Sequence, residues 1–248
     1  AENENGKSSI LKMNLAGKII EENELDFLIT DILYTKEELI SAGIESDDKL
    51  VLQKMKPNLE TANKIDFQQR KKFVTGNFPP LLALSITDEV GVVANTLDDK
   101  YPIDILFQKT EKSGRIISLV DRTFKYVGTK LVTDLVPTSE GGFALTGYWK
   151  EDEKSPMLIL FGKIDRKGHG EMHLISSEMN IIGCDIEESY QDGFAILRAK
   201  EGIENSDIYE MSFILIDSDG GPTDCATMLP CSINKDDILK YRPRMIKV

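Results

Sequence analysis

The sequence predicts an all-β fold, a five-bladed β-propeller in which each blade is a four-stranded antiparallel sheet. Three observations carry this prediction: an apolar run that ends in a polar turn recurs five times, a hairpin pattern recurs between those copies, and the two chain ends resemble complementary halves of one blade. The copies of the first motif are residues 12–17, 54–58, 109–114, 163–168 and 215–220. Four strands in a unit of about 50 residues is the spacing of a propeller blade.

The hairpin pattern places an aspartate at the same point of most units. It is clearest in residues 138–147 and 189–197, where a polar, glycine-containing turn separates two short apolar runs. Weaker copies occupy residues 35–43 and 87–94. Aligning the hairpins brings one column of residues together at spacings of 51 or 52: Asp31, Ala83, Asp134, Asp185 and Asp237. We expect this column to mark the first strand of each blade.

Each full unit then reads as four strands in order. The first carries the column, as in residues 130–136, and the second follows the hairpin turn, as in residues 143–148. The third is long and apolar, as in residues 157–164, which suits a strand that neighbouring blades cover on both faces. The fourth follows a turn whose glycine supplies a positive φ. These glycines are Gly114, Gly168 and Gly220.

The chain ends supply the remaining blade. Residues 9–13 and 18–22 read as a third and a fourth strand, and residues 237–241 and 244–248 read as a first and a second strand. Joining the halves in one sheet would close the ring and remove two open edges. We therefore predict a single domain over residues 1–248. Its parts are a disordered polar leader at 1–7, a composite blade of 8–24 plus 235–248, and internal blades at about 25–70, 78–121, 129–178 and 180–231.

Charge and composition narrow the range of partners. The 248 residues carry a net charge of −12, so the chain should repel nucleic acid. No apolar run reaches the roughly 18–20 residues that span a bilayer, so no transmembrane segment is expected. The three cysteines (Cys184, Cys225 and Cys231) are too few and too irregular for a disulfide scaffold. We expect a monomer that needs no cofactor.

The repeat resembles a family of bacterial secreted and lipoprotein β-propellers, uncharacterised proteins of Bacteroides-like organisms. Their blades read Asp-Gly-Gly-aromatic and then Asp-x-x-Gly, which residues 139–143, 192–194 and 165–168 match best. The resemblance implies a propeller exported from a Gram-negative bacterium to the periplasm, the outer-membrane surface or the medium. A lipid anchor upstream of residue 1 would fit such a protein. The resemblance implies no defined activity.

The aspartate column is the strongest candidate for a functional site. First strands line the central channel of a propeller, so Asp31, Asp134, Asp185 and Asp237 would ring it at one height and bind a ligand there. A ring of carboxylate oxygens could hold Ca²⁺. The structural alternative is that each aspartate accepts backbone amides at a blade interface.

Three tyrosines follow the column closely and should lie near the mouth of the channel: Tyr34, Tyr190 and Tyr241. A tyrosine ring combines an apolar face with a hydroxyl, which suits contact with a protein or a glycan. Packing within a turn is the alternative for each. We predict neither catalytic residues nor a metal site.

The leading functional hypothesis is a non-enzymatic, exported scaffold that contacts a protein, a peptide or a glycan at the channel mouth. The first alternative is a glycosidase that uses channel carboxylates, which must stand about 5–10 Å apart. An aromatic content of 7% with a single tryptophan argues against it, because sugars usually stack on aromatic rings. The second alternative is a calcium-stiffened structural module of the cell envelope.

Overall fold

The computed structural model confirms an all-β chain built of antiparallel sheets. It describes residues 8–35, 37–46, 49–68, 73, 80–85, 87–97, 104–111, 116–120, 128–175, 181–189, 193–201, 208–218, 221 and 231–234. Within these residues the strands form one two-stranded sheet and four four-stranded sheets, in which strands adjacent in the chain pair with each other. No helix in this part of the chain is long and apolar enough to cross a membrane.

The strands follow one another in five groups. The N-terminal hairpin contains β1 (Ser8–Met13) and β2 (Ile19–Leu25). Sheet 1 contains β3 (Leu28–Tyr34), β4 (Leu39–Ser46), β5 (Lys49–Met55) and β6 (Thr61–Gln68). Sheet 2 contains β7 (Leu81–Leu84), β8 (Glu89–Thr96), β9 (Asp104–Glu111) and β10 (Ile116–Val120). Sheet 3 contains β11 (Thr129–Pro137), β12 (Phe143–Lys150), β13 (Leu158–Ile164) and β14 (Gly170–Ile175). Sheet 4 contains β15 (Ile181–Ser189), β16 (Gly193–Glu201), β17 (Ile208–Asp217) and β18 (Cys231–Asn234).

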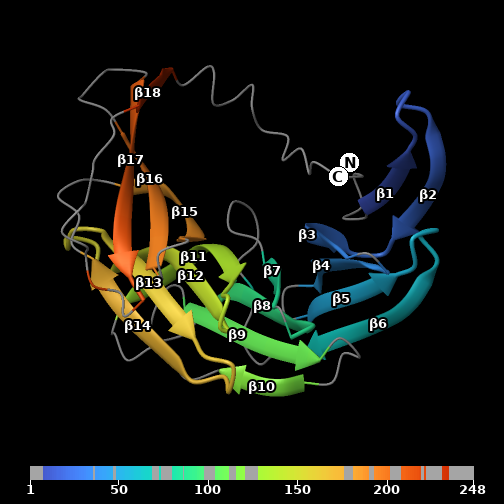
Figure 1. The fold of residues 1–248 in the computed structure, drawn as a ribbon, viewed down its shortest axis with the longest axis horizontal. Coiled ribbons are helices and arrows are strands. Elements are labelled where there is room, and N and C mark those ends of the chain that lie inside the picture. Colours follow the sequence, from blue (N-terminus) through green and yellow to red (C-terminus); the bar gives the residue numbers. More distant parts are fainter. Residues whose placement is uncertain are drawn as a thin grey trace.

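The sheets stand side by side along an arc, as the blades of a propeller do (Figure 1). The first strands β3, β7, β11 and β15 lie on the inner side of the arc, and the fourth strands β6, β10 and β14 lie on its outer side. The arc is open between sheet 4 and the hairpin. Residues 1–7 and 235–248, which the sequence assigns to a leader and to half of the composite blade, lie outside the described residues, so ring closure stays a prediction.

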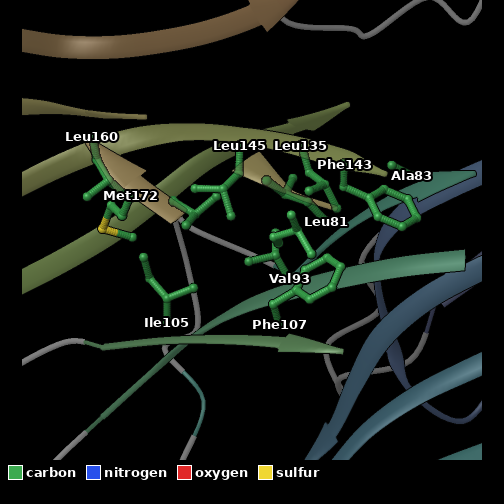
Figure 2. Close-up of a cluster of buried hydrophobic side chains, with 12 residues drawn as sticks. Leu81, Ala83, Val93, Ile105, Phe107, Leu135, Phe143, Leu145, Leu160 and Met172 are labelled. Atoms are coloured by element: carbon green, nitrogen blue, oxygen red, sulfur yellow. The ribbon is translucent and has the colours of Figure 1, made fainter. Parts of the chain in front are cut away.

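The hydrophobic core lies between neighbouring sheets, because each sheet is apolar on both faces. Between sheets 2 and 3, Phe107 and Phe143 have ring centroids 5.5 Å apart, and Leu145 and Leu160 pack beside them (Figure 2). Similar clusters join sheet 1 to sheet 2, sheet 3 to sheet 4, and the hairpin to sheet 1. Burying one such Leu or Phe side chain contributes about 1.5–3 kcal/mol, so these seams between sheets account for much of the stability.

The turn between the third and fourth strands explains one repeated glycine. Gly168 has a φ of 86°, and its amide donates to Asp165 O at 2.9 Å, closing a tight turn. Gly17 and Leu59 close the equivalent turns with φ values of 78° and 59°. The positive φ predicted for this position is confirmed at Gly168. Gly114 and Gly220 lie outside the described residues.

A lysine repeated at one point of the third strand links the hairpin, sheet 2 and sheet 3 each to the sheet that follows it. Lys109 Nζ donates to Arg166 O in the following sheet. Two other lysines make the equivalent contact: Lys12 Nζ to Pro57 O at 2.9 Å, and Lys163 Nζ to Ser218 O at 3.5 Å. We call this contact the lysine bridge. It gives a physical role to the lysine that the sequence repeats in residues 12–17, 109–114 and 163–168.

Candidate functional site

A pocket of about 480 Å³ is lined by residues from the first strands of all four four-stranded sheets, β3, β7, β11 and β15. These strands lie on the inner side of the arc (Figure 1). Four carboxyl side chains line the pocket: Asp31 from β3, Asp134 from β11, and Asp185 and Glu187 from β15. The rest of the lining is apolar and includes Phe213 of β17, which is 43% exposed. No lysine, arginine or histidine among the described residues lines this acidic pocket.

A β-bulge aims the aspartates of sheets 1 and 3 out of the strand ladder. The register shifts between Val132 and Asp134, so Thr133 is the extra residue, and its Oγ1 bonds back to Thr146 O at 3.4 Å. The same shift occurs between Ile29 and Asp31 in β3. An extra residue of this kind bends a strand and re-aims the next side chain. A Thr-Asp pair in the first strand is therefore the local sequence signal of the site.

The bulge requires glycine on the neighbouring strand. A Cβ added at Gly147 would lie 1.9 Å from Leu131 O, and one added at Gly43 would lie 2.1 Å from Leu28 O. Both contacts are with backbone, which cannot move aside as a flexible side chain can. The second strands therefore carry glycine where they pass the bulge.

Both bulge aspartates hold the next sheet by its backbone. Asp31 Oδ2 accepts a hydrogen bond from Leu82 N at 2.9 Å, and Asp134 Oδ2 accepts one from Ile186 N at 2.9 Å. Asp31 Oδ1 also accepts one from Ile32 N at 2.8 Å. This is the structural alternative that the sequence left open, and the structure shows it for both residues. The two carboxyl groups join sheets and line the pocket at the same time.

The alignment that placed Ala83 in the aspartate column is wrong by two residues. Asp31 and Asp134 each lie three residues before the last paired residue of their first strand, and in β7 that position belongs to Leu81. Leu81 and Ala83 are both buried in the apolar cluster against sheet 3 (Figure 2). Even spacing misplaced the column because the equivalent positions Asp31, Leu81 and Asp134 are separated by 50 and then 53 residues.

Sheet 2 replaces the missing aspartate with an asparagine on its second strand. Asn95 Oδ1 accepts a hydrogen bond from Val132 N at 2.8 Å, and Asn95 Nδ2 donates one to Val132 O at 3.0 Å. The side chain is 2% exposed, so both bonds are shielded from water. Asn95 thus provides a polar link between sheets 2 and 3, where the residue equivalent to Asp31 and Asp134 is Leu81.

Asp134 and Asp185 form a carboxyl pair across the seam between sheets 3 and 4. Their carboxyl groups lie within hydrogen-bonding reach of each other. Burial, and then the hydrogen bond and the negative charge of Asp185, raise the pKa of Asp134 to about 8, although the amides of Ile186 and Leu135 act in the opposite direction. Asp134 therefore holds its proton more tightly than an ordinary aspartate does.

Of the predicted tyrosines, the structure describes Tyr34 alone, and Tyr34 does not line this pocket. Tyr34 ends β3, is 51% exposed and is not part of the pocket lining. Tyr190, Tyr241 and Asp237 lie outside the described residues. The structure therefore brings together three of the predicted site residues, Asp31, Asp134 and Asp185.

Phe213 and Glu187 line the pocket but were not among the site residues predicted from the sequence. The position of Phe213 follows from strand pairing. Phe213 stands opposite Leu197, which stands opposite Asp185, so the three form one row across sheet 4. Extending the aspartate column across the sheet by strand pairing would have found it.

The described part of the chain contains no ready metal-binding site. No three histidine, cysteine, aspartate or glutamate side chains there are grouped so that they could hold an ion. Calcium binding stays a prediction.

Comparison with known proteins shows the fold and no more. No protein-family profile and no curated protein matches the sequence. Among solved structures, the chain is similar to an endo-arabinase from Bacteroides thetaiotaomicron VPI-5482, with a TM-score of 0.52 and 13% identity over 82% of this chain and 79% of that one. It is also similar to a PL25 ulvan lyase bound to -[GlcA(1-4)Rha3S]-, with a TM-score of 0.53 and 10% identity over 82% of this chain and 57% of the lyase. The chain spans little more than half the length of the lyase. These similarities identify the architecture as propeller-like.

Proposed function

We propose that the protein is an exported, five-bladed propeller that binds a neutral glycan in its acidic pocket without cleaving it. The observation that carries the proposal is the pocket itself: about 480 Å³, with four carboxyl groups and one half-exposed aromatic ring. In the full ring, residues 235–248 would complete the hairpin sheet. Export and a bacterial-envelope setting follow the resemblance of the repeat to secreted propellers.

The lining of the pocket matches the surface of a neutral sugar. Carboxylate oxygens of Asp31 and Glu187 can accept hydrogen bonds from sugar hydroxyls, and the exposed Phe213 ring can pack on the apolar face of a pyranose or furanose. An acidic glycan would meet four carboxyl groups and no cationic side chain among the described lining residues. That an endo-arabinase and a polysaccharide lyase share the architecture is consistent with a glycan ligand.

One observation favours glycoside hydrolysis as a second candidate. A neutral Asp134 beside ionisable Asp185 and Glu187 is the kind of acid–base set that glycosidases use. The geometry opposes the obvious pair, because Asp134 and Asp185 are in hydrogen-bond contact, closer than the roughly 5 Å that a retaining enzyme needs. Binding without cleavage is therefore the better account of this pair.

The test is direct binding of neutral oligosaccharides, arabino-oligosaccharides first, by isothermal titration calorimetry with a parallel assay for reducing ends. Phe213→Ala and Glu187→Gln should each weaken binding at least about tenfold, since each removes a contact to the ligand worth roughly 1.4 kcal/mol or more. Tyr34→Ala is the matched control, because Tyr34 is equally exposed but outside the pocket. The proposal fails if no neutral oligosaccharide binds, or if both pocket variants bind as the wild type does. New reducing ends would establish the second candidate.

A further inference from the structure

We propose that Asp134 and Asp185 share one proton at neutral pH, and that the seam between sheets 3 and 4, where the pocket opens, therefore becomes less stable as the pH rises toward the range in which that proton is lost. This inference deepens the proposed function, since it names what regulates that pocket, but it can be tested with no ligand present. The reaction is simple: a neutral Asp134 carboxyl donates to the Asp185 carboxylate, and base removes the proton to solvent and leaves two carboxylates.

The position of the two carboxyl groups favours a shared proton, because both line one pocket and the amide that holds Asp134 belongs to the residue after Asp185. Ionised carboxylates only accept hydrogen bonds, so a hydrogen bond between two carboxyl groups needs one of them to be protonated. Asp134 cannot simply turn away, because its Oδ2 is held by the amide of Ile186, the residue after Asp185, at 2.9 Å. The backbone that fixes Asp134 to sheet 4 also brings it against the second carboxyl group.

Among the described residues that line the pocket, none carries a positive charge that could stabilise two carboxylates. The other ionisable side chains in the pocket are Asp31 from β3 and Glu187 from β15, both acidic. The described residues that β7, β16 and β17 contribute are apolar: Leu82, Ala195, Leu197 and Phe213. Nearby on the same two sheets, Glu188 accepts from Ser139, and Arg198 donates to Ser212 at 2.7 Å. Loss of the proton therefore places two like charges in contact beside two more.

The seam between sheets 1 and 2 supplies a control within the same molecule. Asp31 accepts the amide of Leu82 as Asp134 accepts that of Ile186. The residue before Leu82 is Leu81, whereas the residue before Ile186 is Asp185. The two seams share the carboxyl–amide bond and differ in the second carboxyl group.

The expected pH dependence follows from the raised pKa of Asp134. Its folded value of about 8 lies above the ordinary value of 3.8, so the folded chain holds a proton that the unfolded chain has released between those pH values. Stability contributed by this site therefore falls as the pH rises from about 4 to 8 and levels off above. Asp134→Asn removes the titration, since an amide oxygen still accepts from Ile186 N–H while the amide nitrogen donates to Asp185.

The experiment measures urea unfolding between pH 5 and 9.5 for the wild type, Asp134→Asn and Asp31→Asn. The ratio of the wild-type unfolding constant to that of Asp134→Asn should grow by up to about tenfold per pH unit below pH 8 and then become constant. Asp31→Asn should keep the wild-type slope. If Asp134→Asn does not fold, Asp185→Asn takes its place, because Asp185 is the exposed member of the pair. This variant should also flatten the dependence of stability on pH.

Equal pH slopes in the wild type and Asp134→Asn, or a profile that Asp31→Asn flattens as much as Asp134→Asn does, would overturn the shared proton. Carbon-13 spectra give a second readout: one aspartate carboxyl should titrate near pH 8 in the wild type and not in Asp134→Asn. Neither measurement involves a sugar, so failure here leaves the glycan proposal to its own test.

Discussion

Replacing Lys109 by methionine should cost more stability than any other change to the lysine bridges. Lys109 is 1% exposed, and its Nζ lies 3.0 Å from Glu89 Oε2 while donating to Arg166 O in the next sheet. Methionine keeps the apolar stem but leaves the carboxylate without its cation and the carbonyl without its donor. Removing one partner of a buried ion pair costs about 3–5 kcal/mol.

The lower end of that range applies here. Glu89 is 19% exposed and also accepts from Thr87 Oγ1 at 2.9 Å, so water and a hydroxyl still solvate its charge. A loss of about 3 kcal/mol in a chain of this size lowers the melting temperature by roughly 6–12 °C. Thermal unfolding followed by circular dichroism, with urea unfolding at 25 °C, measures both quantities.

Two variants show whether the bridge is responsible. Lys12→Met removes the same contact at the hairpin seam, but Lys12 is 43% exposed, so its loss should cost less than about 1 kcal/mol. Glu89→Gln combined with Lys109→Met should recover part of the loss by removing the stranded charge. Equal effects of Lys109→Met and Lys12→Met, or an unchanged melting temperature in Lys109→Met, would refute the reasoning.

Two further predictions concern the seams. Asn95→Leu leaves the backbone N–H and C=O of Val132 without their partner in a buried position, which should cost about 1–3 kcal/mol of stability for each group. Asn95→Asp restores the acceptor for the N–H and should recover the part of the loss that comes from this group. Urea unfolding of the two variants measures both losses. Deleting residues 236–248 should leave the β1 edge unpaired, with Leu11 and Met13 exposed on it. The variant should therefore self-associate, which sedimentation analysis would detect. A monomeric deletion variant with an unchanged melting temperature would remove ring closure from the account.

Local sequence patterns were enough to predict the strands but not the relation between sheets. The hairpin turns and the glycine at Gly168 are set by residues next to them, so their prediction was confirmed. The placement of Ala83 in the aspartate column was wrong, because spacing along the chain cannot show where one sheet meets the next. Asn95 performs the aspartate's role from another strand, which no alignment of like residues would reveal.

The same limit applied to the pocket. Asp31, Asp134 and Asp185 were singled out by their periodic spacing, and the structure brings them to one cavity. Phe213 was missed because it belongs to the third strand of sheet 4 and reaches the pocket only through strand pairing. The lysine of the motif was visible as a repeat, but its carbonyl partner in the following sheet was not.

The sequence by itself determined a chain of repeated β-hairpins, because strand alternation, turn glycines and apolar third strands are encoded by residues a few positions apart. Only the tertiary structure decided that Asp134 lies against Asp185, while Asp31, in an equivalent strand, accepts the amide of Leu82, which follows a leucine in the chain. Packing between sheets sets those meetings, and packing depends on the size and shape of residues that do not repeat.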